Sequence, residues 1–140
     1  MKPIERRVAV TQATVDRFKD QTFKWGKNDC GRMVAFHLRK LGFGMKMAKA
    51  GSYSSALGAR RALKRLGFAD VLEAVDSYGL PRIAPAAVVV GDIVALPGDS
   101  NMGALGVSVG NGRVLAYHED AAGATIVQPI EFLAAWRAQP

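Results

Sequence analysis

The chain changes character at Pro81 and Pro85, and this change limits its fold more than any other feature. Before the prolines, apolar residues recur at helical spacing among many charges. After them, apolar runs are short and are separated by glycine, asparagine, aspartate and proline, which is typical of strands joined by turns. Helices followed by a small antiparallel sheet indicate an α+β fold. The 140 residues, 49% of them hydrophobic, predict a single domain over 1–140.

Periodicity and capping residues locate the expected helices. The first covers 4–22, with Val8, Val10, Val15 and Phe18 as its apolar residues. The second begins near Asp29 and ends near Gly42, and a basic third helix covers 53–66 with Leu57, Leu63 and Leu66 facing inward. Residues 70–76 fit either a helix or a strand. A last helix is predicted over 130–137, with Phe132, Leu133 and Trp136 as its apolar residues.

Four short runs after the prolines predict strands. Their sequences are VVVGDIVALP, LGVSVG, GRVLAYH and ATIVQPI. Gly110-Asn111-Gly112 lies between the second and third runs and predicts a tight hairpin turn, because asparagine and glycine tolerate the positive φ angles of such turns.

Cys30, the only cysteine, lies in the stretch WGKNDCGRM at the expected start of the second helix. Asn28 and Asp29 are good N-cap residues. A cysteine in a first helical turn is close to unpaired backbone N–H groups, which can lower the pKa of its thiol and make it a nucleophile. The alternative is a small buried apolar residue. A single cysteine also excludes a disulfide framework and a zinc site built on paired cysteines, and we expect no cofactor.

The net charge of +7 is unevenly distributed. Residues 1–65 hold 16 of the 19 basic residues and four acidic ones (+12), whereas residues 66–140 hold three basic and eight acidic ones (−5). Such a chain could bind nucleic acid, an anionic envelope polymer or an acidic protein, or simply expose a solvated basic face. Aromatic residues do not interleave with the basic ones, which disfavours nucleic acid. The expected partner-binding residues are on the third helix: Arg60, Arg61, Lys64 and Arg65.

No segment approaches the roughly 18–20 apolar residues that a membrane span needs. The start, MKPIERRVAV, has charges but no following apolar run or cleavage site, so we expect no signal peptide.

Four short sequence motifs of the chain resemble those of the NlpC-type cell-wall peptidases, a branch of the papain-like cysteine peptidases. Residues 23–26 (FKWG) and 29–31 (DCG) are similar to the family's aromatic turn and Asp-Cys-Ser-Gly helix start. Residues 91–94 (GDIV) and 104–112 (ALGVSVGNG) are similar to its Gly-Asp-Leu-Val strand and its His-Val-Gly-Ile-x-x-Gly-Asn-Gly hairpin. The resemblance covers about residues 20–120 and implies a papain-like fold. The WG-x-N-DC phrase also looks like that of small proteins encoded among bacteriophage tail genes.

The same resemblance breaks at three functional positions. The family's catalytic histidine corresponds to Ala104 and its second polar partner to Ala116. Its oxyanion-side tyrosine corresponds to Phe23, which lacks the hydroxyl donor. A cysteine nucleophile needs a base that takes its proton and later returns it to the leaving amine. The pattern therefore implies a fold that has been kept and a reaction that has been lost.

Two histidines could in principle replace the missing base. His37 follows Cys30 by seven residues, which places it about 10 Å further along the helix and too far for a direct hydrogen bond. His118 is two residues beyond Ala116, about 6.5 Å along the strand, and reaches the cysteine only if a bulge or a register shift moves it. The alternative for His118 is a half-exposed histidine at a strand end.

Three hypotheses follow. The first is a structural component of a bacteriophage tail, at the tail tip, with a degenerate NlpC-type fold; it would be assembled in the host cytoplasm, reside in the virion and bind other tail proteins. The second is an active cysteine peptidase or amidase that hydrolyses host peptidoglycan during phage entry, using Cys30 and His118. The third is a basic nucleic-acid-binding module. The phage context rests on the resemblance alone.

Overall fold

The computed structural model describes residues 2–44, 51–98, 103–117 and 123–139. Within them, the helices come first: α1 (Pro3–Phe18), α2 (Cys30–Leu41), α3 (Ala56–Arg65) and α4 (Val71–Asp76). A 3-10 turn at Pro85–Ala87 precedes the strands β1 (Ile93–Leu96), β2 (Ala104–Gly110), β3 (Arg113–Tyr117), β4 (Ala124–Val127) and β5 (Ala134–Trp136). They form one antiparallel sheet in the order β4-β3-β2-β1-β5. The expected α+β class is confirmed.

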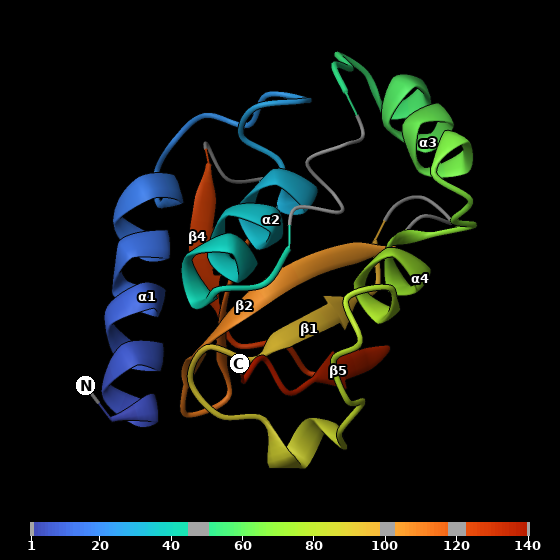
Figure 1. Ribbon diagram of the computed structural model, residues 1–140. Helices are drawn as coiled ribbons and strands as arrows, with labels where there is room; N and C mark the ends of the chain where they lie inside the picture. Colours follow the sequence, from blue (N-terminus) through green and yellow to red (C-terminus); the bar gives the residue numbers. More distant parts are fainter. Residues whose placement is uncertain (1, 45–50, 99–102, 118–122, 140) are drawn as a thin grey trace.

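The helices and the sheet form two layers, with α2 lying over β2 and α1 packed beside α2 (Figure 1). The side chains of Met33, Val34, Leu38 and Leu41 on α2 are fully buried. They belong to one apolar cluster with Ile93, Leu105 and Leu115 of the sheet. The core therefore lies between α2 and the central strands.

Alternate strand residues point to the opposite face of the sheet, where no described helix packs. Val94, Val114 and Ala135 form a second buried cluster there, with Val88 and Phe132 packed against it. Irregular segments thus cover this face, and β1 is buried along its whole length, as its continuous apolar sequence predicts.

The predicted limits of α2 are confirmed. The Asp29 side chain accepts a hydrogen bond from the Arg32 backbone N–H at 2.8 Å and caps the first turn. Gly42 ends the helix with φ +102°, a left-handed conformation that glycine adopts without a steric penalty.

The predicted hairpin turn is also confirmed. Gly110 pairs with Arg113 across it, and Asn111 and Gly112 have φ angles of +56° and +75°. Two consecutive positive φ angles match the right-handed twist of β2 and β3. Residues 70–76, which fitted either element, form α4 after an Asp70 cap.

The predicted helix over 130–137 is wrong, because β5 occupies Ala134–Trp136. Its backbone is bonded on both sides. It pairs with β1 on one edge, and on the other Ala135 O accepts from Ile83 N at 2.9 Å while Arg137 N donates to Pro81 O at 2.9 Å. This tertiary pairing outweighs the helical pattern of the sequence.

Two other helices differ from their predicted form. α1 ends at Phe18 and not at 22, because Lys19 and Thr22 form bridges to residues 124 and 123 beside β4. α3 is shorter than 53–66, and Leu57 does not face inward: it is 54% exposed, while Ala59 and Ala62 are buried. Among the described residues, no helix is long and apolar enough to cross a membrane.

Candidate functional site around Cys30

Cys30 is the first residue of α2, and its side chain faces β2. The backbone N–H of Leu105 on β2 acts on the thiol together with the N–H groups of Gly31 and Cys30 itself. The structure thus brings the predicted cysteine to the start of β2, the central strand of the sheet, where Leu105 follows Ala104. The cysteine occupies the start of a helix packed on an antiparallel sheet, as expected.

The thiol is nevertheless not activated. Cys30 is half-buried, and the pKa of its thiol is raised to about 11. Desolvation by burial is the largest cause; the carboxylate of Asp29 adds to the rise, and the Leu105 N–H opposes it. The helix N–H groups do lower the pKa of the thiol, as a helix start can, but desolvation of the thiolate outweighs them. At neutral pH the sulfur is protonated.

The three positions at which the family's functional residues are missing lie on β2 and β3 or pack against β3. Ala104 starts β2 opposite Leu96, and Ala116 of β3 pairs with Gly106 of β2. The ring of Phe23 packs edge-on against Trp25 and Tyr117, with centroid distances of 4.9 and 5.5 Å. None of the three can accept a proton from sulfur.

His37 does not supply the missing base. Its Nε2 lies 2.9 Å from the carbonyl oxygen of Gly91 and its Nδ1 lies 2.8 Å from the hydroxyl of Thr14. A carbonyl can only accept, so Nε2 carries the proton and Nδ1 accepts from Thr14. Burial lowers the pKa of His37 to about 4. Both ring nitrogens are occupied between α1 and the segment before β1, away from the thiol.

His118, the other candidate base, lies outside the described residues, as do Glu119 and Asp120. Within the described part of the chain, no group of three or more histidine, cysteine, aspartate or glutamate side chains could hold a metal ion.

Two tyrosines near the thiol were missed from the sequence. The hydroxyl of Tyr53 donates to Asp29 Oδ2 at 2.7 Å. The hydroxyl of Tyr117 is buried and has no hydrogen-bond partner among the described residues, and burial raises its pKa to about 12. A thiolate at Cys30 would raise the pKa of both phenols, which places them near the sulfur. No local motif marks either residue.

Asp29 is the organising residue of the site. Besides capping α2 and accepting from Tyr53, its carboxylate accepts from the Gly26 backbone N–H at 2.7 Å. One buried side chain therefore fixes the turn at 25–28, the start of α2 and the segment that contains Tyr53. The sequence identified it only as a cap.

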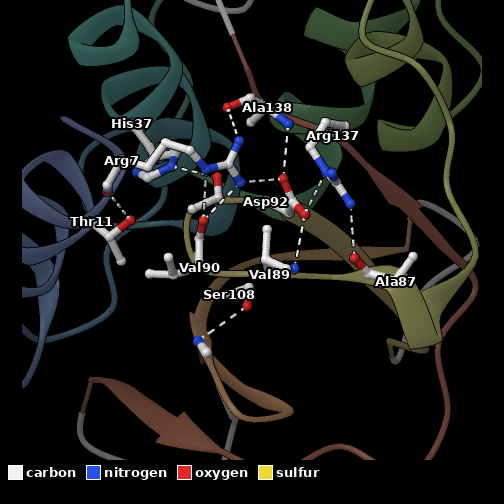
Figure 2. Close-up of polar contacts among 12 residues, drawn as sticks. Arg7, Thr11, His37, Ala87, Val89, Val90, Asp92, Ser108, Arg137 and Ala138 are labelled. Atoms are coloured by element: carbon white, nitrogen blue, oxygen red, sulfur yellow. Dashed lines mark hydrogen bonds and ion pairs between the residues drawn. The ribbon is translucent and has the colours of Figure 1, made fainter. Parts of the chain in front are cut away.

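A second polar cluster, also missed, surrounds the carboxylate of Asp92, the residue before β1 (Figure 2). The buried carboxylate of Asp92 contacts Arg7 of α1 at 2.5 Å and Arg137 near the C-terminus at 3.1 Å. It also accepts from the backbone N–H groups of Val89 and Ala138. The carboxylate oxygens of Asp92 thus accept all these hydrogen bonds from the protein itself. The cluster joins three segments that are distant in the sequence, and its contacts are those of a structural cluster rather than of a ligand site. The signal in the sequence was the helical spacing of Arg7, Thr11, Thr14 and Phe18, the buried face of α1.

The four predicted partner-binding residues of α3 are all exposed: Arg60, Arg61, Lys64 and Arg65. α3 stands at the periphery of the molecule (Figure 1), with only Ala59 and Ala62 fully buried. The exposed Leu57 adds an apolar side chain to the same helix.

A shallow hollow of about 430 Å³ lies at the β4 edge, away from these features. Cys30 is not among its lining residues, which are Lys19, Arg113, Thr125, Ile126, Val127 and Gln128.

Comparison with curated proteins returns no match. Residues 4–138 match the family model described as a domain of unknown function, DUF6950, and the chain therefore belongs to that family.

Proposed function

We propose that this domain is a structural component of a bacteriophage tail, at the tail tip, built on a papain-like fold of the NlpC type that has lost its catalytic base. The phage context and the family come from the resemblance of the FKWG, DCG, GDIV and ALGVSVGNG phrases. The observation that carries the loss of catalysis is the state of Cys30. Its thiol lies at a helix start against β2 with a pKa raised to about 11, beside an alanine where a base would be needed.

The proposed loss of catalytic activity is tested on purified peptidoglycan. The wild type is compared with Cys30→Ala and His118→Ala, and soluble fragments are measured by mass spectrometry. We expect no cleavage products from any of the three proteins, because a protonated thiol without a base is a weak nucleophile. Cleavage by the wild type that is lost in both variants would refute degeneracy and identify His118 as the base.

The basic face of α3 supplies the docking surface in this proposal. Four exposed cations on one ten-residue helix, with no acidic residue in it, favour an acidic protein surface as the partner. A single exposed ion pair contributes only about 0–1 kcal/mol, so the cluster has to act together.

This docking is tested by reversing the four α3 charges to glutamate and measuring incorporation into tail particles. The matched control reverses four exposed basic residues elsewhere: Lys2, Lys24, Lys27 and Arg113. Both variants undergo the same change in net charge. We expect only the α3 variant to lose incorporation, and equal incorporation of the two variants would contradict the proposal.

A further inference from the structure

The segment that leads into α3 crosses the start of α2 and is fastened there by side chains on both sides of Cys30. Tyr53 donates its hydroxyl to Asp29 Oδ2 at 2.7 Å, and the guanidinium of Arg32 donates to the carbonyl of Gly51. The same guanidinium lies 5.0 Å from the centroid of the Tyr53 ring. Each of these contacts joins residue 51 or 53 to a residue within two positions of the cysteine.

The backbone of this segment also packs closely against the turn before α2. A Cβ atom added to Gly26 would lie 2.1 Å from the carbonyl oxygen of Tyr53, far inside van der Waals contact. Gly26 has φ +83°, so glycine is required there both for its backbone conformation and for this close approach.

We propose that residues 51–53 form a strap that limits access to the half-buried Cys30, with the Tyr53 hydroxyl as its latch on Asp29. The strap opens locally and increases the exposure of the thiol without unfolding the domain. Its described polar attachments are one hydrogen bond from a tyrosine and one from an arginine, together with a cation–π contact, and no residue of 51–55 is fully buried. Segments with few buried apolar contacts open at lower free energy than the core.

The strap accounts for the state of the thiol. Burial is the largest cause of its raised pKa, and Tyr53 is close enough that a thiolate would raise the pKa of the phenol in turn. When the strap opens, more water reaches the sulfur and the pKa of the thiol falls toward its ordinary value, near a helix start that favours thiolate. The strap therefore sets the reactivity of Cys30, whether or not the domain has any enzymatic activity.

The first test measures the rate at which iodoacetamide alkylates Cys30, the only thiol in the chain, at pH 8. Tyr53→Phe removes the latch hydrogen bond to a carboxylate, and we expect alkylation to become about tenfold to a hundredfold faster. Tyr117→Phe is the matched control, since it removes a hydroxyl near the same sulfur that has no partner among the described residues. We expect its rate to stay within about twofold of the wild type.

The second test displaces the strap from the other side. Gly26→Ala introduces a methyl group against the Tyr53 carbonyl, whereas Gly79→Ala introduces one at a similar φ, +78°, with no atom within 4 Å. Both changes carry the same backbone penalty, so only the contact with the strap differs between them. We expect faster alkylation in Gly26→Ala and an unchanged rate in Gly79→Ala.

Urea separates local opening from global unfolding. We expect the alkylation rates of Tyr53→Phe and Gly26→Ala to change little over urea concentrations at which the folded state persists, because local opening exposes little surface. Wild-type rates in both variants would overturn the proposal. So would faster alkylation whose urea dependence equals that of global unfolding.

Discussion

Replacing Asp92 by alanine tests how the two ends of the chain are joined. The carboxylate of Asp92 is fully buried, and it contacts Arg7 at 2.5 Å and Arg137 at 3.1 Å. Arg7 is itself only 4% exposed, so Asp92→Ala leaves a guanidinium in the interior without its counter-ion. Arg7 keeps the carbonyls of Val90 and Ala138 as acceptors, but these do not neutralise its charge.

The magnitude follows from the burial of both partners. Removing one member of a buried ion pair costs about 3–5 kcal/mol, because the remaining charge has already lost its hydration. Folded domains are stable by only about 5–15 kcal/mol in total. For a domain of this size, that loss corresponds to a melting temperature about 10–17 °C lower.

The assay is urea unfolding followed by tryptophan fluorescence, with Asp16→Ala as the matched control. Asp16 is exposed and accepts one hydrogen bond from Gln12 on the surface of α1, so we expect its replacement to change stability by no more than about 0.5 kcal/mol. A loss below about 1 kcal/mol in Asp92→Ala, or equal losses in the two variants, would refute the view that this cluster stabilises the fold.

Three further predictions concern other buried groups. Burial lowers the pKa of His37 from 6.5 to about 4. As the pH falls, the unfolded state therefore binds a proton at this histidine before the folded state does. The free energy of unfolding should decrease by about 3 kcal/mol as the pH falls from 6.5 toward 4. His37→Gln should flatten this part of the pH profile of urea unfolding, and an unchanged slope would contradict the assignment. Gly106→Ala places a Cβ 2.3 Å from Val114 Cγ1 and should cost about 1–3 kcal/mol in a urea titration, whereas Gly44→Ala, with no atom within 4 Å, should be nearly neutral; equal effects would argue against the close packing of β2 on β3. Trp136→Phe removes the indole N–H bond to Asp76 at 2.8 Å and part of a fully buried ring, and should lower the melting temperature by several degrees; a melting temperature within about 1 °C of the wild type would contradict it.

Local signals in the sequence determined the elements whose limits depend on neighbouring residues. Asp29 and Gly42 marked both ends of α2, because a capping carboxylate and a left-handed glycine act on the backbone within a few residues. The turn at Asn111 and Gly112 was equally local. The α+β class followed in the same way from the change of periodicity at Pro81 and Pro85.

Only the tertiary structure decided the rest. Ala134–Trp136 became a strand because β1 and residues 81–83 offered hydrogen-bond partners on both edges, which no local pattern in 130–137 records. The link from Arg7 to Asp92 spans 85 residues. The pKa of Cys30 followed the same logic: its place at a helix start was local, but the burial that keeps its thiol protonated comes from the packing of distant segments around it. Desolvation depends on everything that surrounds a group, and the sequence near that group does not contain it.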